Sequence, residues 1–288
     1  MKNICPACNN LGILKYPERI ELDKITDLTY ASRKLPELMH YDLFECINCK
    51  SLFTNRDVDL KDLIGRYEKA DYDSNVEAKF AAETYVHYLE KALPNFRGSV
   101  LDIGAGDGAF LAEAQKKFAT KVLGIEPSSV AISYNTDSAV TILNTSIELF
   151  QTSEKFDLIT CFQTIEHLKS PDLFLENIKK HLQNNGFIAI TCHNRNSFVN
   201  KILKEKSPIF DIEHLQVFTN VGIENLFHKV GLEIVFSKSY KNIYPLHYWL
   251  KLSPLPSPIK RYVLKLSKFL KFQIQINVGN HLIIGKIK

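Results

Sequence analysis

The chain has 288 residues, of which 45% are hydrophobic and 24% are charged, and it carries a formal net charge of +4. This composition fits a globular protein that can bury a full core, either as one large domain with additions or as two domains. No segment reaches the ~20 uncharged apolar residues that span a bilayer, and the N-terminus does not resemble a signal peptide. We therefore expect a cytoplasmic protein.

Two cysteine pairs mark the N-terminal part of the chain. Cys5 and Cys8 form one C-x-x-C element, and Cys46 and Cys49 form the other. Such pairs supply four thiolates in a tetrahedron, which is the geometry of structural zinc. The alternatives are disulfides, which a reducing cytoplasm disfavours, and an iron–sulfur site with the same ligands. The pattern predicts a zinc ribbon-like module over residues 1–59, with a structural Zn²⁺ that has no open coordination position.

Alternating strands and helices are predicted after the cysteine pairs. Residues 60–97 are expected to form a helical linker, in which Phe80, Tyr85 and Leu89 recur at helix spacing. Apolar runs then predict strands near residues 99–103, 121–125, 139–142, 156–162, 187–192, 233–239 and 281–287. Because helical segments separate most of these runs, we expect an α/β domain over residues 98–288, with a parallel sheet covered by helices on both faces.

A glycine-rich turn carries the first functional signal. Residues 101–110 read LDIGAGDGAF, which is a short strand, a turn with Gly104, Gly106 and Gly108, and the start of a helix. Glu126 follows the next apolar run. Glycines let the backbone approach a ligand closely, and a carboxylate after the second strand accepts hydrogen bonds from ribose hydroxyls. The pattern predicts a site for an adenosyl cofactor.

Two carboxylates distinguish this turn from that of nicotinamide enzymes. Asp102 and Asp107 would repel a diphosphate, whereas they suit a ligand with a cationic amino-acid portion. The stretch resembles motif I of the class I S-adenosylmethionine-dependent methyltransferases, and the segments around Asn144 and Glu166 resemble other parts of that core. The resemblance covers about residues 98–240 and implies a Rossmann-like seven-stranded α/β sheet with S-adenosylmethionine as the cofactor. The cofactor-binding residues that it implies are Asp102, Gly104, Ala105, Gly106, Gly108, Glu126, Pro127, Ser146, Ile147, Phe162 and Gln163.

Candidate proton acceptors lie beyond the carboxyl ends of the predicted strands. Methyl transfer is an in-line displacement at an activated sulfonium, so the protein must align the acceptor and, for a hydroxyl or a carbon acid, remove a proton. Ligands of such sheets bind at the carboxyl ends, where His167 follows the fourth strand and Glu213 and His214 follow the fifth. We predict that His214, oriented by Glu213, accepts the proton, with His167 as the second candidate.

The cysteine pairs and the core together are similar to a narrower family. A zinc module, a Tyr-rich linker and a Glu-His pair after the fifth strand resemble the NDP-sugar C-methyltransferases of deoxysugar biosynthesis. This resemblance implies that Tyr72, His167, Glu213 and His214 line a sugar site. That family has a further C-terminal domain that grips the nucleotide of its substrate, and the sequence shows no counterpart. Either the acceptor is not a nucleotide sugar, or its nucleotide is held differently. We expect a small-molecule or glycan acceptor, such as a sugar or a lipid-linked or surface-polysaccharide precursor.

Two other functions stay open. The core is also similar to the ubiquinone-pathway O-methyltransferases, which implies a quinone-type acceptor. A non-catalytic docking subunit with a degenerate cofactor fold is the second alternative, although the intact glycines and Glu126 disfavour it. No Asn-Pro-Pro-Tyr or Asp-Pro-Pro-Tyr follows the fourth strand, which argues against methylation of amino groups on adenine or glutamine. We expect no nucleic-acid partner.

A basic segment is predicted before the last strand. From Ile234 to the end of the chain there are ten lysines and arginines and no acidic residue. We predict a helical insert over residues 241–279, in which Ile259, Tyr262 and Leu266 share one helical face and lysines spread over the other. Such a helix near an aromatic cluster is typical of peripheral contact with a membrane, here the inner membrane face. The alternatives are a helical hairpin packed over the sheet edge as an acceptor lid, and a site for an anionic substrate.

Overall fold

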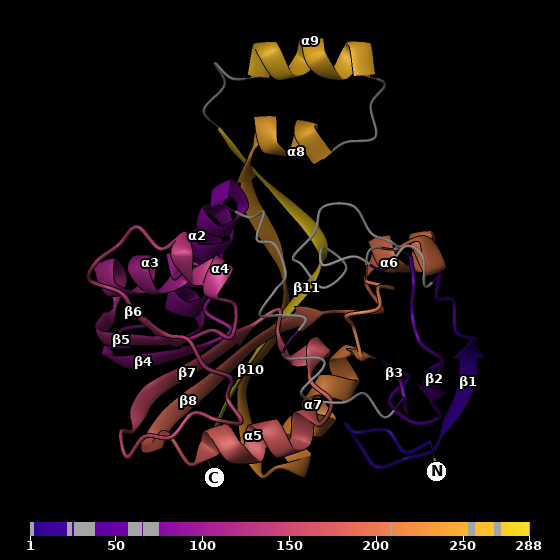
Figure 1. Cartoon of the computed structure of the whole chain (residues 1–288), viewed down its shortest axis with the longest axis horizontal. Coiled ribbons are helices and arrows are strands. Elements are labelled where there is room, and N and C mark those ends of the chain that lie inside the picture. Colours follow the sequence, from indigo (N-terminus) through magenta and orange to yellow (C-terminus); the bar gives the residue numbers. More distant parts are fainter. Residues whose placement is uncertain are drawn as a thin grey trace.

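The structure is a computed structural model that describes residues 3–21, 25, 38–56, 65, 75–207, 209–252, 257–267 and 272–287. Tyr72, the predicted sugar-site tyrosine, lies outside these residues. The described chain forms a large central sheet with helices on both faces and a smaller sheet beside it (Figure 1).

The central sheet has seven strands in the order β10-β11-β8-β7-β4-β5-β6. Their bounds are β4 (Gly98–Ile103), β5 (Ala119–Ile125), β6 (Thr141–Leu143), β7 (Phe156–Phe162), β8 (Leu182–His193), β10 (Leu232–Pro245) and β11 (Gln273–Ile287). The five strands β4, β5, β6, β7 and β8 run parallel, whereas β11 runs antiparallel to both β8 and β10. The Rossmann-like α/β sheet is confirmed, and every strand predicted from an apolar run has a counterpart.

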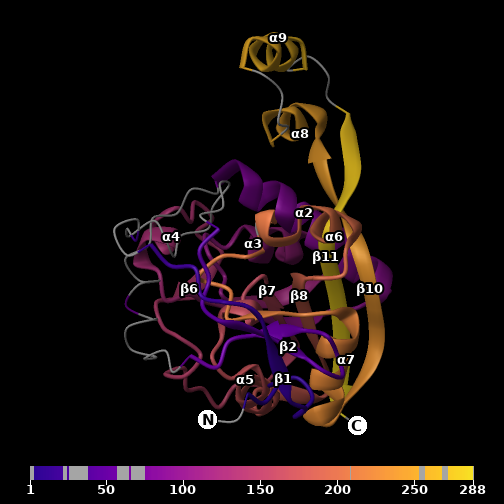
Figure 2. The ribbon, with the colours of Figure 1, turned by 90° about the vertical axis from the view of Figure 1, so that its right-hand side faces the viewer.

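Helices cover both faces of this sheet (Figures 1 and 2). One face carries α2 (Asn75–Ala92) and α3 (Ala109–Lys117), and the other carries α5 (Pro171–Lys179) and α7 (Asn220–Lys229). Since successive strand residues point to opposite faces, Val100 packs in the cluster of α2 and α3, and its neighbour Leu101 packs in the cluster of α5 and α7. Short helical segments fill the connections: α4 (Ser129–Ser133), a 3₁₀ turn (Ile165–His167), α6 (Phe198–Leu203) and a second 3₁₀ turn (Lys204–Lys206).

The N-terminal residues form a module that shares its sheet with the rest of the chain. This cysteine module comprises the described residues 3–21 and 38–56. Its strands are β1 (Gly12–Tyr16), β2 (Leu43–Cys46) and β3 (Leu52–Phe53), and the fourth strand is β9 (Gln216–Val217). Leu52 and Val217 face each other across β3 and β9 and lie in one buried cluster with Ile209 and Phe210. The segment 209–219 therefore belongs to the module as much as to the core.

Residues 241–279 differ from the helical insert that we predicted. The two ends of this segment extend β10 and β11 as a ribbon, in which residues 242–245 pair with residues 273–276. Only α8 (Leu246–Leu252) and α9 (Ser257–Ser267) are helical. The buried side chains of Tyr240, Asn242 and Tyr244 alternate with less buried ones, which is the period of a strand. This ribbon with its two helices, here called the arm, projects beyond the body of the molecule (Figures 1 and 2).

Candidate functional site

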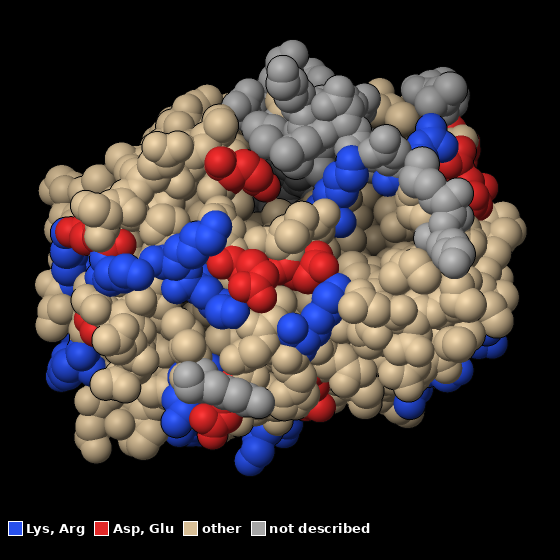
Figure 3. Space-filling model, turned by 90° about the horizontal axis from the view of Figure 1, so that it is seen from below, with Lys and Arg blue, Asp and Glu red and all other residues tan. Residues whose placement is uncertain are grey.

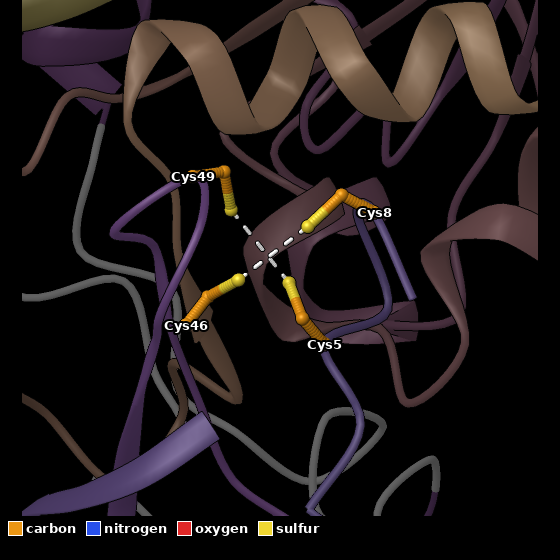
Figure 4. A group of neighbouring side chains, drawn as sticks. All are labelled: Cys5, Cys8, Cys46 and Cys49. Carbon is orange, nitrogen blue, oxygen red and sulfur yellow. Dashed lines mark hydrogen bonds between the residues drawn. The ribbon is translucent and has the colours of Figure 1, made fainter. Parts of the chain in front are cut away.

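Four cysteine side chains converge where two loops of the cysteine module meet (Figure 4). They are Cys5, Cys8, Cys46 and Cys49. In both C-x-x-C elements the residue after the second cysteine has a left-handed backbone, with a φ of 58° at Asn9 and 61° at Lys50. The two elements are thus folded alike, and each turns its thiols toward the same point.

The spacing of these sulfur atoms fits a tetrahedral zinc ion. Sγ of Cys5 lies 3.7 Å from Sγ of Cys49, and Sγ of Cys8 lies 3.4 Å from Sγ of Cys46. Thiolates about 2.3 Å from a zinc ion form a tetrahedron with S···S edges of about 3.8 Å, whereas a disulfide bond is about 2 Å long. The hydrogen bond with Cys5 lowers the pKa of the Cys49 thiol to about 5. The donor set therefore suits zinc with all four positions filled by protein, and no disulfide joins these residues.

Hydrogen bonds tie the cysteine module to the candidate base. Oγ1 of Thr219 donates to the carbonyl oxygen of Cys49 at 2.6 Å. On the other side of β9, the N–H of Thr54 donates to the carbonyl oxygen of Leu215 at 2.9 Å. Leu215 directly follows His214, so the module fixes the backbone on which this histidine stands.

The glycine turn after β4 is shaped for close approach of a ligand. Gly104, Gly106 and Gly108 all have positive φ, at 75°, 56° and 79°. A Cβ atom at Gly104 would lie 2.5 Å from Oγ1 of Thr164, and one at Gly108 would lie 2.9 Å from Cδ1 of Ile142. Conformation and space both require glycine here, as the sequence pattern predicted.

Two buried carboxylates lie beside this turn. Glu126 accepts hydrogen bonds from the N–H groups of Gly106 at 3.0 Å and Ser128 at 2.8 Å, through different oxygens. Each oxygen keeps a second lone pair, which is available to a hydroxyl. Burial raises the pKa of Asp102 to about 7, and its Oδ1 accepts a hydrogen bond from Oγ1 of Thr160 at 2.7 Å. Glu126 thus faces the turn from β5, while Asp102 braces the turn from the end of β4.

Buried polar atoms near the turn have no hydrogen-bond partner within the described residues. They are both amide atoms of Gln163 and the hydroxyl of Ser146. Gln163 also has a φ of 52°, a left-handed backbone that costs energy for a residue other than glycine. Since an unsatisfied buried amide costs about 1–3 kcal/mol, this geometry fits a site that a polar ligand completes.

The remaining predicted cofactor residues shape the surroundings of the turn. The ring of Phe162 packs with Tyr85 at 4.3 Å and with Phe110 at 4.8 Å between ring centroids. The carbonyl of Pro127 accepts a hydrogen bond from Nδ2 of Asn144 at 2.7 Å. Ala105 and Ile147 are buried in the hydrophobic clusters of the two sheet faces.

A group of buried and partly buried histidines lies at the carboxyl ends of β7 and β8. The rings of His167 and His214 are 4.8 Å apart, and those of His193 and His214 are 5.6 Å apart. Oε2 of Glu213 lies 3.7 Å from Nδ1 of His167, and a donor atom of His214 lies within 4.8 Å of both side chains. Burial lowers the pKa of His167 and of His193 to about 4, and it lowers the pKa of His214 well below the ordinary value. These rings are therefore neutral near pH 7.

One ring nitrogen of His214 lies buried without a hydrogen-bond partner within the described residues. This nitrogen is Nδ1. In a neutral imidazole one nitrogen carries the proton and the other a lone pair. With the proton on Nε2, Nδ1 of His214 offers a buried lone pair that can accept a proton.

Two polar residues at this histidine group, His193 and Asn280, were not predicted from the sequence. Nδ1 of His193 lies 3.0 Å from Oδ1 of Asn280, and Nδ2 of Asn280 donates to Oδ1 of Asn242 at 3.0 Å. Asn242 in turn donates to the hydroxyl of Tyr244 at 2.9 Å. His193 directly follows the strand predicted over residues 187–192, so the rule that ligands bind at carboxyl ends should have selected it. Asn280 lies on an antiparallel strand and carried no such signal.

Comparison with known proteins decides the family. The profile of a family described as a methyltransferase domain matches residues 72–236, more than half of the chain. The chain belongs to this methyltransferase family. The methyltransferase is 37% identical over 118 residues to the ubiquinone biosynthesis O-methyltransferase of Actinobacillus pleuropneumoniae, a match that covers 37% of this chain and 50% of that protein. It is 30% identical over 103 residues to the protein of the same name from Bradyrhizobium diazoefficiens, covering 34% of this chain and 40% of that one.

Solved structures share the fold at low sequence identity. A S-adenosylmethionine-dependent methyltransferase from Thermotoga maritima, described as a possible histamine N-methyltransferase, superposes with a TM-score of 0.52 at 18% identity, covering 75% of this chain and 93% of that one. A Haloferax volcanii complex of a Trm112 methyltransferase activator and a putative methyltransferase gives 0.51 at 15% identity, covering 74% and 93%. The chain spans about half or less of the length of the curated relatives it matches.

Proposed function

We propose that the protein is an S-adenosylmethionine-dependent methyltransferase whose acceptor is deprotonated during transfer. The observation that carries this proposal is the neutral, buried His214, whose Nδ1 is available to take a proton. It follows β8, at the same carboxyl edge of the sheet as the glycine turn after β4. An amine acceptor can be methylated by alignment alone, whereas a hydroxyl or a carbon acid needs a base. The site therefore favours an oxygen or carbon acceptor.

The cofactor is assigned to the glycine turn. Glu126 would accept hydrogen bonds from the ribose hydroxyls, and the unsatisfied groups of Gln163 and Ser146 would bind polar atoms of the ligand. S-adenosylmethionine supplies a methyl group on a sulfonium that is already activated. The residues of the chain then have to align the acceptor with that methyl carbon and to take up the acceptor's proton at Nδ1 of His214.

We assign a structural zinc ion to the four cysteines. Its role would be to hold the cysteine module together, and through β9 to hold the backbone of His214.

For the acceptor we propose a small molecule or glycan, with a sugar or a lipid-linked or surface-polysaccharide precursor as the preferred class. The polar groups of His167, His193 and Glu213 suit an acceptor with several hydroxyls. A quinone-type acceptor is the competing candidate, because the curated relatives carry the name ubiquinone biosynthesis O-methyltransferase.

A second mechanism uses the same residues as cation ligands. One donor atom each of His167, Glu213 and His214 lies within 4.8 Å of the others. Two imidazoles and a carboxylate are a common donor set for a divalent metal with open positions. In that case added Mg²⁺ or Mn²⁺ would raise turnover, whereas a general base at His214 makes turnover independent of these ions.

The test is an acceptor screen that follows release of S-adenosylhomocysteine. Sugars, lipid-linked glycans and quinols are offered to the wild type, to His214→Ala and to His228→Ala, whose imidazole is exposed on α7. We expect turnover to fall by about a hundredfold or more in His214→Ala alone, with unchanged affinity for S-adenosylhomocysteine. Equal turnover of all three proteins with the true acceptor would overturn the role of His214.

The pH profile provides an independent check on this base. Because burial lowers the pKa of His214, the ring stays unprotonated below the ordinary histidine value of about 6.5. We therefore expect kcat/KM to stay at its plateau through pH 6.5 and to fall only at more acidic pH. An acid limb centred at pH 6.5 or above would contradict the assignment.

A further inference from the structure

The arm leaves the body at the edge of the sheet that carries the candidate site. Strands β8 and β10 both run antiparallel to β11, so their carboxyl ends point the same way. The glycine turn follows β4 and His167 follows β7, and both strands run parallel to β8. The ribbon of the arm therefore extends from the side on which an acceptor has to enter.

Aromatic packing anchors the inner half of the arm. The rings of Tyr244 and Tyr248 lie 5.9 Å and 5.8 Å from the ring of Phe80 on α2. Trp249 stacks on Tyr244 at 5.1 Å, and its Nε1 donates to the carbonyl oxygen of Ile274 at 2.9 Å. These aromatic side chains hold α8 against the body.

The outer helix α9 presents an apolar stripe to the solvent. Ile259, Tyr262 and Leu266 are 52%, 67% and 52% exposed, and their spacing of three and four residues places them on one face. Arg261 and Lys265, four residues apart, are exposed along one border of this stripe. Isolated exposed apolar side chains are ordinary, but a continuous stripe at the tip of a projection marks a contact surface.

A second patch of the same kind lies on α6. Phe198 and Ile202, one helical turn apart, are 79% and 62% exposed. Lys201, Lys204 and Lys206 are exposed close by in the chain, with the exposed Glu205 among them. Helix α6 follows β8, so this patch also lies at the carboxyl edge of the sheet.

Charge identifies the partner surface as anionic. The segment from Ile234 onward has ten basic and no acidic residues, and since the whole chain carries +4, the residues before it carry a net −6. The end of the molecule opposite the arm shows basic and acidic side chains side by side (Figure 3). The basic excess is thus confined to the part of the chain that also exposes the apolar stripe.

We propose that α9 and α6 dock the protein on an anionic membrane surface. An apolar stripe bordered by basic side chains inserts among lipid headgroups while the charges contact phosphates, and a convex helix needs no complementary groove for this contact. None of the described helices is long and apolar enough to cross a bilayer, so the contact is peripheral. Docking turns the carboxyl edge of the sheet toward the headgroups. This docking is independent of which acceptor is methylated.

The test is sedimentation of the full chain with phosphatidylcholine vesicles, with and without phosphatidylglycerol, at physiological salt. Two double variants probe the surface: Tyr262→Ser with Leu266→Ser, and Arg261→Gln with Lys265→Gln. Matched controls remove the same groups elsewhere: Leu149→Ser with Leu173→Ser, both exposed leucines, and Lys117→Gln with Lys180→Gln, both exposed lysines. All eight positions are exposed, so each variant should keep the wild-type melting temperature.

We expect the wild type to bind only vesicles that contain phosphatidylglycerol, and both arm variants to lose about tenfold or more in partitioning. Both controls should bind like the wild type. Failure of the wild type to sediment, or equal losses in arm and control variants, would overturn the proposal. A wild-type dimer in analytical ultracentrifugation that Tyr262→Ser with Leu266→Ser dissociates would also overturn it, because a second copy would then cover the stripe.

Discussion

The cysteine module and the arm are both additions to the methyltransferase core, and they are attached in opposite ways. The module shares a sheet with β9 and a buried cluster with Ile209 and Phe210, and Arg195 of the core donates to Glu45 of β2 at 2.6 Å. The arm leaves on a two-stranded ribbon, and its outer helix exposes apolar side chains. A part that is built into the site should affect turnover when it is damaged, whereas a projecting part should affect only where the protein binds.

Removal of the metal should show the difference between the cysteine module and the arm most strongly. Metal analysis of protein purified without added metal should find about one zinc per chain. In Cys49→Ser we expect the free energy of unfolding to fall by about 5 kcal/mol or more, because metal binding and folding of such modules are coupled. If that variant does not fold, the wild type treated with a chelator should lose turnover while its affinity for S-adenosylhomocysteine, measured by calorimetry, stays the same.

The arm provides the control for this experiment. Tyr262→Ser with Leu266→Ser should keep full zinc content, stability and turnover with a water-soluble acceptor. Iron with a visible chromophore, or full activity of the metal-free protein, would remove the distinction between the two additions.

The histidine group between the module and the core should make stability depend on pH. Burial lowers the pKa of His193 to about 4, so below pH 6.5 the unfolded chain binds a proton that the folded chain does not. The contribution of this ring is thus present above its unfolded pKa and lost as pH falls toward 4. The variant His193→Asn keeps a donor for Asn280. Between about pH 7 and about pH 5, its free energy of unfolding in urea should fall by about 2 kcal/mol less than that of the wild type. Equal falls in the two proteins would contradict the conclusion that burial keeps the His193 ring neutral.

The cofactor turn belongs to neither addition, so its variants should leave both intact. Glu126→Ala removes the acceptor of two backbone N–H groups and of the ribose hydroxyls. We expect binding of S-adenosylmethionine to weaken by about 1.5–3 kcal/mol in calorimetry. Glu126→Gln keeps one acceptor oxygen and should lose less. Unchanged affinity in Glu126→Ala would place the cofactor elsewhere.

The smallest expected effect concerns one hydrogen bond between module and core. Thr219 caps α7 through Gly222 and also donates to the carbonyl of Cys49. Thr219→Val should cost about 1–2 kcal/mol of stability and raise KM for the acceptor. Ser197→Ala removes the cap of α6 without a contact to the module, and it should cost about 1 kcal/mol with no change in KM. Equal KM values in the two variants would show that this contact is only structural.

The sequence predicted those parts of the molecule that depend on local patterns. The glycine turn with Glu126 and the cysteine pairs are short motifs whose residue types follow from backbone geometry and metal preference, and the seven strands follow from apolar runs. The pairing of β9 with β3 could not be predicted, because a two-residue strand has no period and its partner lies far away in the chain. The link between His193 and Asn280 joins positions 87 residues apart, and only the folded sheet brings them together.

The prediction of helix at the two ends of the arm was wrong for a different reason. Tyr240, Asn242 and Tyr244 alternate inward as in a strand, but polar residues at these positions hide the period. The apolar and basic residues of α9 were predicted on opposite faces. In the structure, Val263 and Ser267 are less exposed than Ile259 and Tyr262. Amphipathic patterns define faces, whereas the side that is covered depends on what lies next to the helix.

A crystal structure of the protein with S-adenosylhomocysteine tests the central claim most directly. We predict that the adenosyl group lies over Gly104 and Gly106, with the ribose hydroxyls on Glu126 and a polar atom of the ligand within hydrogen-bond distance of Gln163. The sulfur atom should then face the side chains of His167 and His214. A ligand bound away from Glu126, or with its sulfur pointing away from these histidines, would contradict the proposed methyl transfer.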